Sequence, residues 1–125
     1  MNFRDVKRAL GQLKEKDLSV GLEFSGYNKD TKQQMFGVSK NSIGSHGLPV
    51  YSFRTPSNLS DVQAAKIPVD YLTAHYALFQ KANLRKGQSV LIHTGTSGVG
   101  MAAIQLAQSR SLTVFATCSA AKRQH

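Results

Sequence analysis

The 125-residue sequence has little cysteine and no long hydrophobic run. Its one cysteine, Cys118, excludes the disulfide framework that holds many small secreted proteins together. No segment approaches the roughly 20 apolar residues that a membrane-spanning helix needs. The first residues, 1–5, contain no apolar stretch of the signal-peptide type. We therefore expect a cytoplasmic protein without a membrane span.

Acidic residues are also scarce, and none occurs after Asp70. Seven acids face sixteen lysines and arginines, which gives a formal net charge of +9. A basic chain can bind nucleic acid, but here the basic residues are scattered, and no aromatic residues alternate with them to form a stacking surface. We therefore expect no nucleic-acid partner. An anionic small ligand, such as a phosphorylated cofactor, accounts for the same excess of positive charge.

The chain does contain enough apolar sequence for a folded domain, with 41% hydrophobic and 18% charged residues. Its first half favours short strands at residues 18–24, 35–38 and 49–53, separated by a polar turn at 28–32 and a break at 44–47. This pattern is typical of a small barrel or sandwich. Val6, Leu10 and Leu13 recur at helical spacing, which predicts a short helix within residues 1–15.

The second half has the spacing of helices and of a β-α-β unit. We expect a short helix at 59–65 with Ser60 as its N-cap, ended by Pro68, and a second helix capped by Asp70. The second helix carries apolar residues on one face, namely Tyr71, Ala74, Leu78 and Ala82. A strand at 89–93, a turn at 94–98, a helix to about Ser109 and a strand at 112–117 follow. This order predicts a parallel sheet.

Two parallel strands are too few for a doubly wound sheet, because its outer faces and free edge would stay uncovered. The sequence ends where a further helix is expected to begin. We therefore expect the chain to be a fragment of a larger enzyme.

The glycine-rich turn of the β-α-β unit is the strongest chemical signal. A strand, a glycine turn and a helix in this order bind a dinucleotide pyrophosphate, since small residues let the backbone approach the phosphates and the helix N-terminus supplies free N–H groups. The G-x-G-x-x-G pattern corresponds to Gly95, Ser97 and Gly100. The middle glycine is replaced by Ser97, whose side chain is expected to crowd or reorient the phosphates, with Gly98 compensating in part.

Three other nucleotide-binding patterns do not match this sequence. A kinase-type phosphate loop needs a lysine after its last glycine, where this chain has Met101. A short-chain reductase would have differently spaced glycines close to its N-terminus. A methyltransferase would usually have an acid at the end of the second strand, and this chain has none there.

The end of the second strand favours one dinucleotide over another. NAD enzymes place Asp or Glu there for the ribose 2′-hydroxyl, whereas NADP enzymes use basic and small polar groups for a 2′-phosphate. Ser119, Lys122 and Arg123 supply a hydroxyl and two cations at this place. The alternative is that Lys122 and Arg123 are solvent-facing residues at the start of a helix. Their position favours NADPH.

The histidines and the cysteine form no catalytic pattern. His75 and His93 lack metal-ligand spacing with Cys118, and we interpret them as structural residues. Cys118 is expected to be half-buried and not to act as a nucleophile. No serine-hydrolase elbow is present in the glycine turn.

Several collinear motifs resemble a known family. Residues 90–104 are similar to the cofactor turn of medium-chain reductases related to quinone reductase. Residues 2–6, 21–26, 68–78 and 114–117 resemble the enoyl-reductase domain of animal-type fatty acid synthase. Polyketide synthase enoyl reductases are the near alternative. Many of these carry a tyrosine in the region where this chain has Leu13. The lack of that tyrosine favours the fatty acid synthase.

The resemblance implies an α/β architecture in two parts. Residues 1–69 would be part of a GroES-like catalytic domain, and residues 70–125 the first β-α-β unit of an NADP-binding Rossmann domain. NADPH would deliver hydride to the β-carbon of a trans-2-enoyl thioester carried by an acyl carrier protein, in fatty acid synthesis. The other synthase domains would be partners, and the parent enzyme would be a homodimer.

Carried over by position, the resemblance also implies a set of cofactor-binding residues. They are Thr73, Thr94, Gly95, Thr96, Ser97, Gly98, Val99, Gly100, Ser119, Lys122 and Arg123. Thr73 would lie near the nicotinamide, and Asn2 and Arg4 on the catalytic-domain side. No catalytic residue is expected in this chain, because the family's proton donors, a lysine and an aspartate, would lie beyond His125.

Two hypotheses follow. The first is a partial NADPH-dependent enoyl-thioester reductase, expected to be inactive in isolation. The second is a non-catalytic, divergent or pseudoenzyme fragment that keeps only the reductase fold. Ser97 and the early end of the sequence at His125 motivate the second hypothesis.

Overall fold

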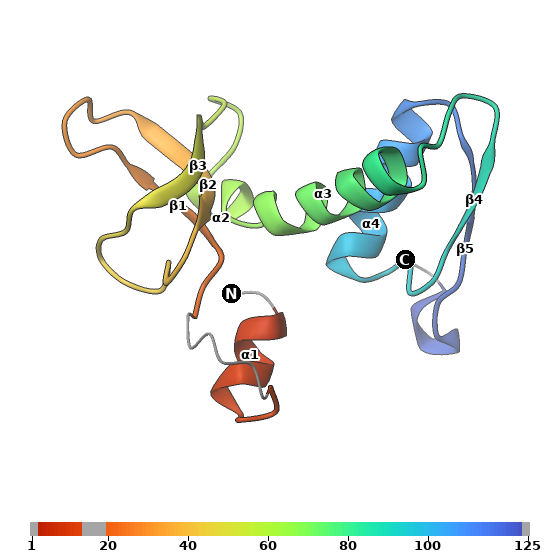
Figure 1. The fold of residues 1–125 in the computed structure, drawn as a ribbon, viewed down its shortest axis with the longest axis horizontal. Coiled ribbons are helices and arrows are strands. Elements are labelled where there is room, and N and C mark those ends of the chain that lie inside the picture. Colours follow the sequence, from red (N-terminus) through yellow and green to blue (C-terminus); the bar gives the residue numbers. More distant parts are fainter. Residues whose placement is uncertain (1–2, 14–19, 124–125) are drawn as a thin grey trace. The chain divides into compact units, whose positions relative to one another are not determined.

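The computed structural model describes residues 3–13 and 20–123. Predictions for Asn2, Leu18 and Ser19 therefore lie outside the described residues. The chain divides into two compact units, Met1–Val69 and Asp70–His125, and each is described by itself (Figure 1). The functional assignment of residues 1–69 and 70–125 to two domains stays a prediction.

An antiparallel three-stranded sheet forms most of the first unit. Its strands are β1 (Glu23–Tyr27), β2 (Gln34–Ser39) and β3 (Pro49–Arg54), in the order β1-β2-β3. The predicted strands at 35–38 and 49–53 are confirmed. The predicted strand at 18–24 is wrong in its bounds, because the chain pairs with β2 from Glu23 to Tyr27.

The hairpin between β1 and β2 explains why β1 extends further than predicted. The Asn28 side-chain oxygen accepts hydrogen bonds from the backbone N–H groups of Asp30 (3.0 Å) and Thr31 (2.9 Å). Lys32 then takes a left-handed conformation with φ 57°. An Asx-type turn of this kind reverses the chain and sets the pairing register. The predicted polar turn is confirmed, and it draws Ser25 and Gly26 into the strand.

Gly37 lets the central strand lie close to β3. A Cβ at this position would lie 2.0 Å from the Tyr51 carbonyl oxygen and 2.8 Å from the Ser52 Cα. No side chain fits there. The pairing of β2 with β3 shifts register one residue later, between Val38 and Ser39.

Two short helices complete the first unit, α1 (Phe3–Ala9) and α2 (Asp61–Ala64). Asp5 of α1 is buried and accepts a 3.0 Å hydrogen bond from the Gly21 N–H. The Asp61 carboxylate accepts hydrogen bonds from Ser25 Oγ (2.7 Å) and Gln34 Nε2 (2.6 Å), which tie α2 to β1 and β2. These two bonds lower the pKa of Asp61.

The sequence predicts the start of α2 correctly and the start of the helix that follows it wrongly. Ser60 is the N-cap of α2, as expected, and forms a capping box with Gln63. Pro68 does not end this helix but begins the next, α3 (Pro68–His75). Proline suits a first helical position, since the N–H it lacks would have no intrahelical partner. Asp70 is consequently not a cap, and it lies in the first turn of α3.

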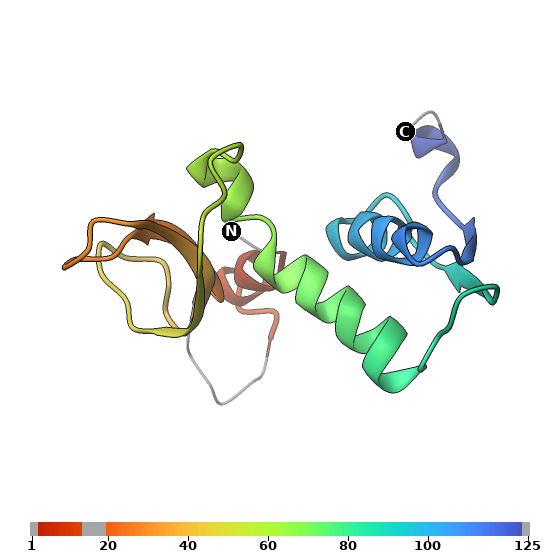
Figure 2. The same ribbon diagram turned by 90° about the horizontal axis from the view of Figure 1, so that it is seen from above.

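The second unit is a β-α-β unit with α3 packed on it (Figure 2). α3 continues into a π-helical segment, η1 (Tyr76–Lys81), and strand β4 (Ser89–Ile92), helix α4 (Gly98–Ser109) and strand β5 (Thr113–Ala116) follow. A 3₁₀ turn, η2 (Ala120–Lys122), lies after β5. The strands pair in parallel, from Ser89 with Thr113 to Ile92 with Ala116, as predicted.

Small side chains on α4 form the centre of the second unit's core. Its buried members are Ala74, Leu78, Ile92, Ala102, Ala103, Ala107 and Leu112. The predicted apolar face of the α3–η1 helix is confirmed at Ala74 and Leu78, whereas Ala82 is exposed. The Tyr71 hydroxyl donates a hydrogen bond to Gln105 and joins α3 to α4. In the described part of the chain, no helix has the length and apolar character to cross a membrane.

Replacing Gly37 tests the close approach of β2 and β3. We expect Gly37→Ala to lower the free energy of unfolding by about 1–3 kcal/mol, because the added methyl group has no space. Urea unfolding followed by tyrosine fluorescence measures the change. Gly26→Ala is the matched control in β1, since nothing lies within 4 Å of its added Cβ. Equal effects of the two substitutions would contradict this account.

Candidate functional site

The turn between β4 and α4 is held by hydrogen bonds to its own backbone and to the end of β5. Thr94 adopts a left-handed conformation with φ 57°, and its carbonyl accepts a 2.9 Å hydrogen bond from the Ser97 N–H. Gly95 N–H donates to the Thr117 carbonyl at 2.8 Å. Thr117 N–H in turn donates to the Ile92 carbonyl at 3.0 Å. The turn therefore has a defined position at the carboxyl ends of both strands.

Two glycines let α4 begin directly on this turn. A Cβ on Gly100 would lie 2.4 Å from the Thr94 carbonyl oxygen and 2.9 Å from the Gly95 Cα. A Cβ on Gly95 would lie 3.0 Å from the Ala116 Cβ and 3.2 Å from the Ile104 Cδ1. The first and last glycines of the motif thus serve close packing of helix, turn and strand.

Ser97 is the N-cap of α4. Its backbone is extended (φ −81°, ψ 165°), and its Oγ accepts a 3.1 Å hydrogen bond from the Gly100 N–H. Serine is among the preferred N-cap residues, and its place just before a helical run was a signal that sequence reasoning missed. The hydroxyl is thus used within the helix terminus. The predicted crowding of phosphates by Ser97 stays a prediction.

The start of α4 has the general properties of an anion site. The first N–H groups of a helix have no intrahelical acceptor, and the helix dipole gives them partial positive charge. Ser97 satisfies one of them, at Gly100. Gly98 and Val99 are exposed and occupy the first two positions of the helix.

Asp70 is a part of this site that sequence reasoning assigned to a different role. A Cβ on Gly98 would lie 2.1 Å from Asp70 Oδ2 and 2.8 Å from Asp70 Cγ. The last carboxylate of the sequence therefore lies against the first residue of α4. Burial raises the pKa of Asp70, because a charged carboxylate loses solvation there. No local sequence signal predicts this contact, which arises from the packing of α3 on α4.

The remaining predicted cofactor residues lie on exposed segments. Ser119 precedes η2, Lys122 ends it and Arg123 follows it, and all three are exposed. They come after β5 and so follow the same edge of the sheet as the glycine turn. Thr73 is exposed on α3, and Thr96 is half-buried in the turn. Asn2 is outside the described residues, and Arg4 is half-buried in α1.

Histidine and cysteine positions correct one expectation. Cys118 is exposed, not half-buried, because it lies beyond the last paired residue of β5. His93 Nδ1 lies 3.1 Å from Thr117 Oγ1, and the His75 ring packs edge-on to Phe79 with centroids 5.2 Å apart. Within residues 3–13 and 20–123, no group of three potential metal ligands comes together.

The chain as a whole is similar to segments of large synthases. No protein-family model matches the chain. The chain is 41% identical over 132 residues to mycoketide-CoA synthase from Mycobacterium tuberculosis, covering 97% of this chain and 3% of the synthase. It is 38% identical over 133 residues to erythronolide synthase from Saccharopolyspora erythraea, covering 98% of this chain and 4% of that protein.

Solved structures show the same partial fold. The CurK enoyl reductase matches with a TM-score of 0.88 and 31% identity, over 99% of this chain and 44% of that one. The quinone oxidoreductase from Thermus thermophilus, solved alone and with NADPH, matches with a TM-score of 0.80 and 27% identity, over 95% and 41%. The predicted α/β class, a GroES-like part followed by the start of a Rossmann sheet, is confirmed as a partial medium-chain enoyl reductase fold. A fatty acid synthase parent is not confirmed.

The N-cap role of Ser97 can be measured. We expect Ser97→Ala to lower the free energy of unfolding by about 1 kcal/mol, and Ser97→Gly by only a few tenths, as is usual for N-caps. Urea unfolding followed by circular dichroism reports both values. Ser119→Ala is the matched control, because Ser119 occupies an N-cap position without a side-chain hydrogen bond. An equal loss in Ser97→Ala and Ser119→Ala would refute the cap.

Asp70 should make stability depend on pH. Its pKa is raised in the folded state, so the folded state has its full stability below the ordinary value of 3.8, where Asp70 is protonated. This stability is lost as the pH rises through the folded-state pKa, because the buried carboxylate then becomes charged. We expect Asp70→Asn to raise the melting temperature at pH 7, with a smaller effect at pH 4.

Asp61→Asn should behave oppositely and lower the melting temperature at pH 7. The pKa of Asp61 is lowered in the folded state, so its carboxylate stabilises the protein above pH 3.8, and this stabilisation is lost on acidification. Thermal melts from pH 3 to 8 measure both, and a lower melting temperature for Asp70→Asn at pH 7 would overturn the account.

Proposed function

We propose that this chain is part of an NADPH-dependent enoyl reductase domain of a multidomain synthase. The observation that carries the proposal is the β4-turn-α4-β5 unit, whose glycines let α4 begin directly on the turn at the carboxyl ends of the parallel strands. The similarity to the CurK enoyl reductase and to large synthases supports it. The substrate would be a trans-2-enoyl thioester on an acyl carrier protein, and the other synthase domains would be its partners.

The described residues fit a dinucleotide at the turn. Gly95 and Gly100 let the turn pack closely between α4 and β5, which sets the start of α4 at the carboxyl ends of the strands. The first N–H groups of α4 would donate to its oxygens. Val99 and Thr96 would border the same place, while Thr73 would orient the nicotinamide. NADPH, when bound, would supply the hydride for reduction of the double bond.

The choice of NADPH over NADH rests on the residues after β5. Lys122 and Arg123 are exposed, and no acidic residue occurs anywhere after Asp70. Two cations and the Ser119 hydroxyl would bind a 2′-phosphate, whereas a free ribose hydroxyl is normally held by an acid. The Thermus quinone oxidoreductase, solved with NADPH, is consistent with this choice.

We propose a polyketide-type parent in place of the fatty acid synthase that the sequence motifs favoured. The highly reducing polyketide synthase azaB from Aspergillus niger is 40% identical over 138 residues, covering 99% of this chain and 5% of that protein. The two synthases described above also align with nearly all of this chain. The chain spans only 3–4% of their lengths, so the reaction, its substrate and its partners are proposals for the whole protein. None of the residues in this chain is proposed as the proton donor.

The second candidate function is a non-catalytic segment that keeps the reductase fold. The observation that favours it is Asp70, whose carboxylate lies against Gly98, where the pyrophosphate would sit. Two like charges at this place oppose each other. Saturable NADPH binding by the protein would favour the reductase, and no binding at any pH would favour the second candidate.

Removing the two cations after β5 tests the cofactor assignment. We expect Lys122→Ala with Arg123→Ala to raise the Kd for NADPH at least about tenfold, since a hydrogen bond to a charged group contributes about 1.5–3 kcal/mol. The Kd for NADH should change little, because NADH has no 2′-phosphate. NADPH and NADH fluorescence titrations measure both constants.

Lys40→Ala with Lys81→Ala is the matched control for net charge, because both lysines are exposed and neither is a predicted cofactor residue. The control should leave the ratio of the two constants unchanged. Equal losses for NADPH and NADH in the Lys122 and Arg123 variant would rule out the 2′-phosphate assignment.

A further inference from the structure

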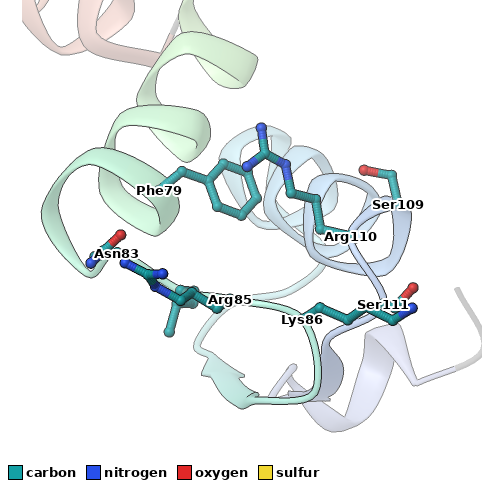
Figure 3. Close-up of a pocket in the computed structure, with 8 residues that line it drawn as sticks. Phe79, Asn83, Arg85, Lys86, Ser109, Arg110 and Ser111 are labelled. Carbon is teal, nitrogen blue, oxygen red and sulfur yellow. The ribbon is translucent and has the colours of Figure 1, made fainter.

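A polar hollow lies in the second unit, away from the glycine turn. It has a volume of about 430 Å³ and is formed by the loop after η1 and the end of α4 (Figure 3). Its residues precede β4 and β5, whereas the glycine turn and Ser119 follow those strands. Because the strands are parallel, the hollow lies at the opposite edge of the sheet from the candidate cofactor site.

Three basic residues line this hollow. Arg85 and Lys86 come from the loop after η1, and Arg110 comes from the C-cap of α4 (Figure 3). Asp70 is the one acid between residues 70 and 125, and it lies against Gly98 at the far end of α4. Among the described residues 70–123, no acidic side chain is therefore placed to neutralise the three cations. Clustered positive charge of this kind attracts anions.

Phe79, which lines the hollow, orients one of the guanidinium groups. The Arg110 guanidinium carbon lies 4.1 Å from the centroid of the Phe79 ring, which is a stacked cation–π arrangement. Stacking holds the plane of the guanidinium while its N–H groups stay free to donate at the edge. A fixed fork of donors loses less entropy on binding than a mobile one.

Neutral hydrogen-bonding groups complete the lining. They are the side chains of Asn83, Ser109 and Ser111, all exposed. Asn83 and Ser111 have left-handed backbones, with φ 49° and 58°, so both loops turn sharply at the rim. Guanidinium, ammonium, hydroxyl and amide donors together match a ligand group with several acceptor oxygens.

We propose that this hollow binds a phosphate group. In Figure 3 the Arg85 side chain extends toward Asn83 and the Lys86 side chain toward Ser111, at opposite ends of the hollow. A phosphate can accept from the Arg110 guanidinium and keep further oxygens for a second donor of the lining. The group could be free inorganic phosphate or the phosphate ester of a larger ligand, and the chemistry of recognition is shared. The site is distinct from the turn proposed for NADPH, and it does not depend on that proposal.

A simpler account of the cations is that they neutralise the negative C-terminal end of α4. That account explains Arg110 at the helix C-cap. It predicts that Arg85 and Lys86 contribute to stability at most and that phosphate has no saturable effect at the hollow. The two accounts therefore differ in a binding measurement.

Amide NMR titration of the whole 125-residue protein with inorganic phosphate, at constant ionic strength, separates them. We expect saturable shifts at the amides of Lys86, Ser109 and Ser111. In Arg85→Gln with Lys86→Gln the apparent Kd should rise at least about tenfold. Lys81→Gln is the matched control, because Lys81 lies over the Tyr76 ring at 5.2 Å and does not line the hollow. Its Kd should equal that of the unmodified protein.

A parallel titration with glycerol 2-phosphate distinguishes the two sources. Equal or weaker binding of the ester indicates free phosphate, and tighter binding indicates a phosphate ester; both support the site. Linear shifts without saturation, shifts confined to residues 94–100 and 119–123, or the same Kd in the double variant would each overturn the proposal. Melting curves of the double variant establish that it is folded before titration.

Discussion

The second unit depends on the absence of a side chain at Gly100. A methyl group there would lie 2.4 Å from the Thr94 carbonyl oxygen, so α4 can start on the glycine turn only with glycine at this position. The close start brings the small residues Ala102, Ala103 and Ala107 onto the sheet, where they form the core with Ile92. The same contact keeps the helix N-terminus at the carboxyl edge of the strands. Packing and the candidate site thus share one steric requirement.

Charge in this unit is organised by a single carboxylate. Asp70 lies against the first residue of α4, and the six basic residues that follow it in sequence have no other acid within residues 70–125. Three of them line the hollow at one edge of the sheet, and Lys122 and Arg123 follow the other edge. Both edges are therefore suited to anions, although Asp70 opposes a phosphate at the turn. The glycine motif alone does not predict this repulsion, because Asp70 lies far from the motif in sequence.

Ser97 shows how a departure from a motif can have a local structural reason. In the pattern it stands in place of a glycine that allows close approach to phosphates. In the structure its hydroxyl caps α4 at Gly100, so the side chain contributes to the helix that forms the site. Capping and cofactor binding are compatible uses of the same residue, because only one of the terminal N–H groups is satisfied.

The sequence by itself determined the elements whose signals are local. The Asn28 turn, the Ser60 cap, the parallel β-α-β order and the glycine turn were all predicted, because each depends on residues a few positions apart. Tertiary structure decided what depends on distant residues. Asp70 meets Gly98 through the packing of α3 on α4, and Arg110 of one helix end stacks on Phe79 of another helix. Helical periodicity places a residue on a face, but only the packing of two elements decides which side chains meet there.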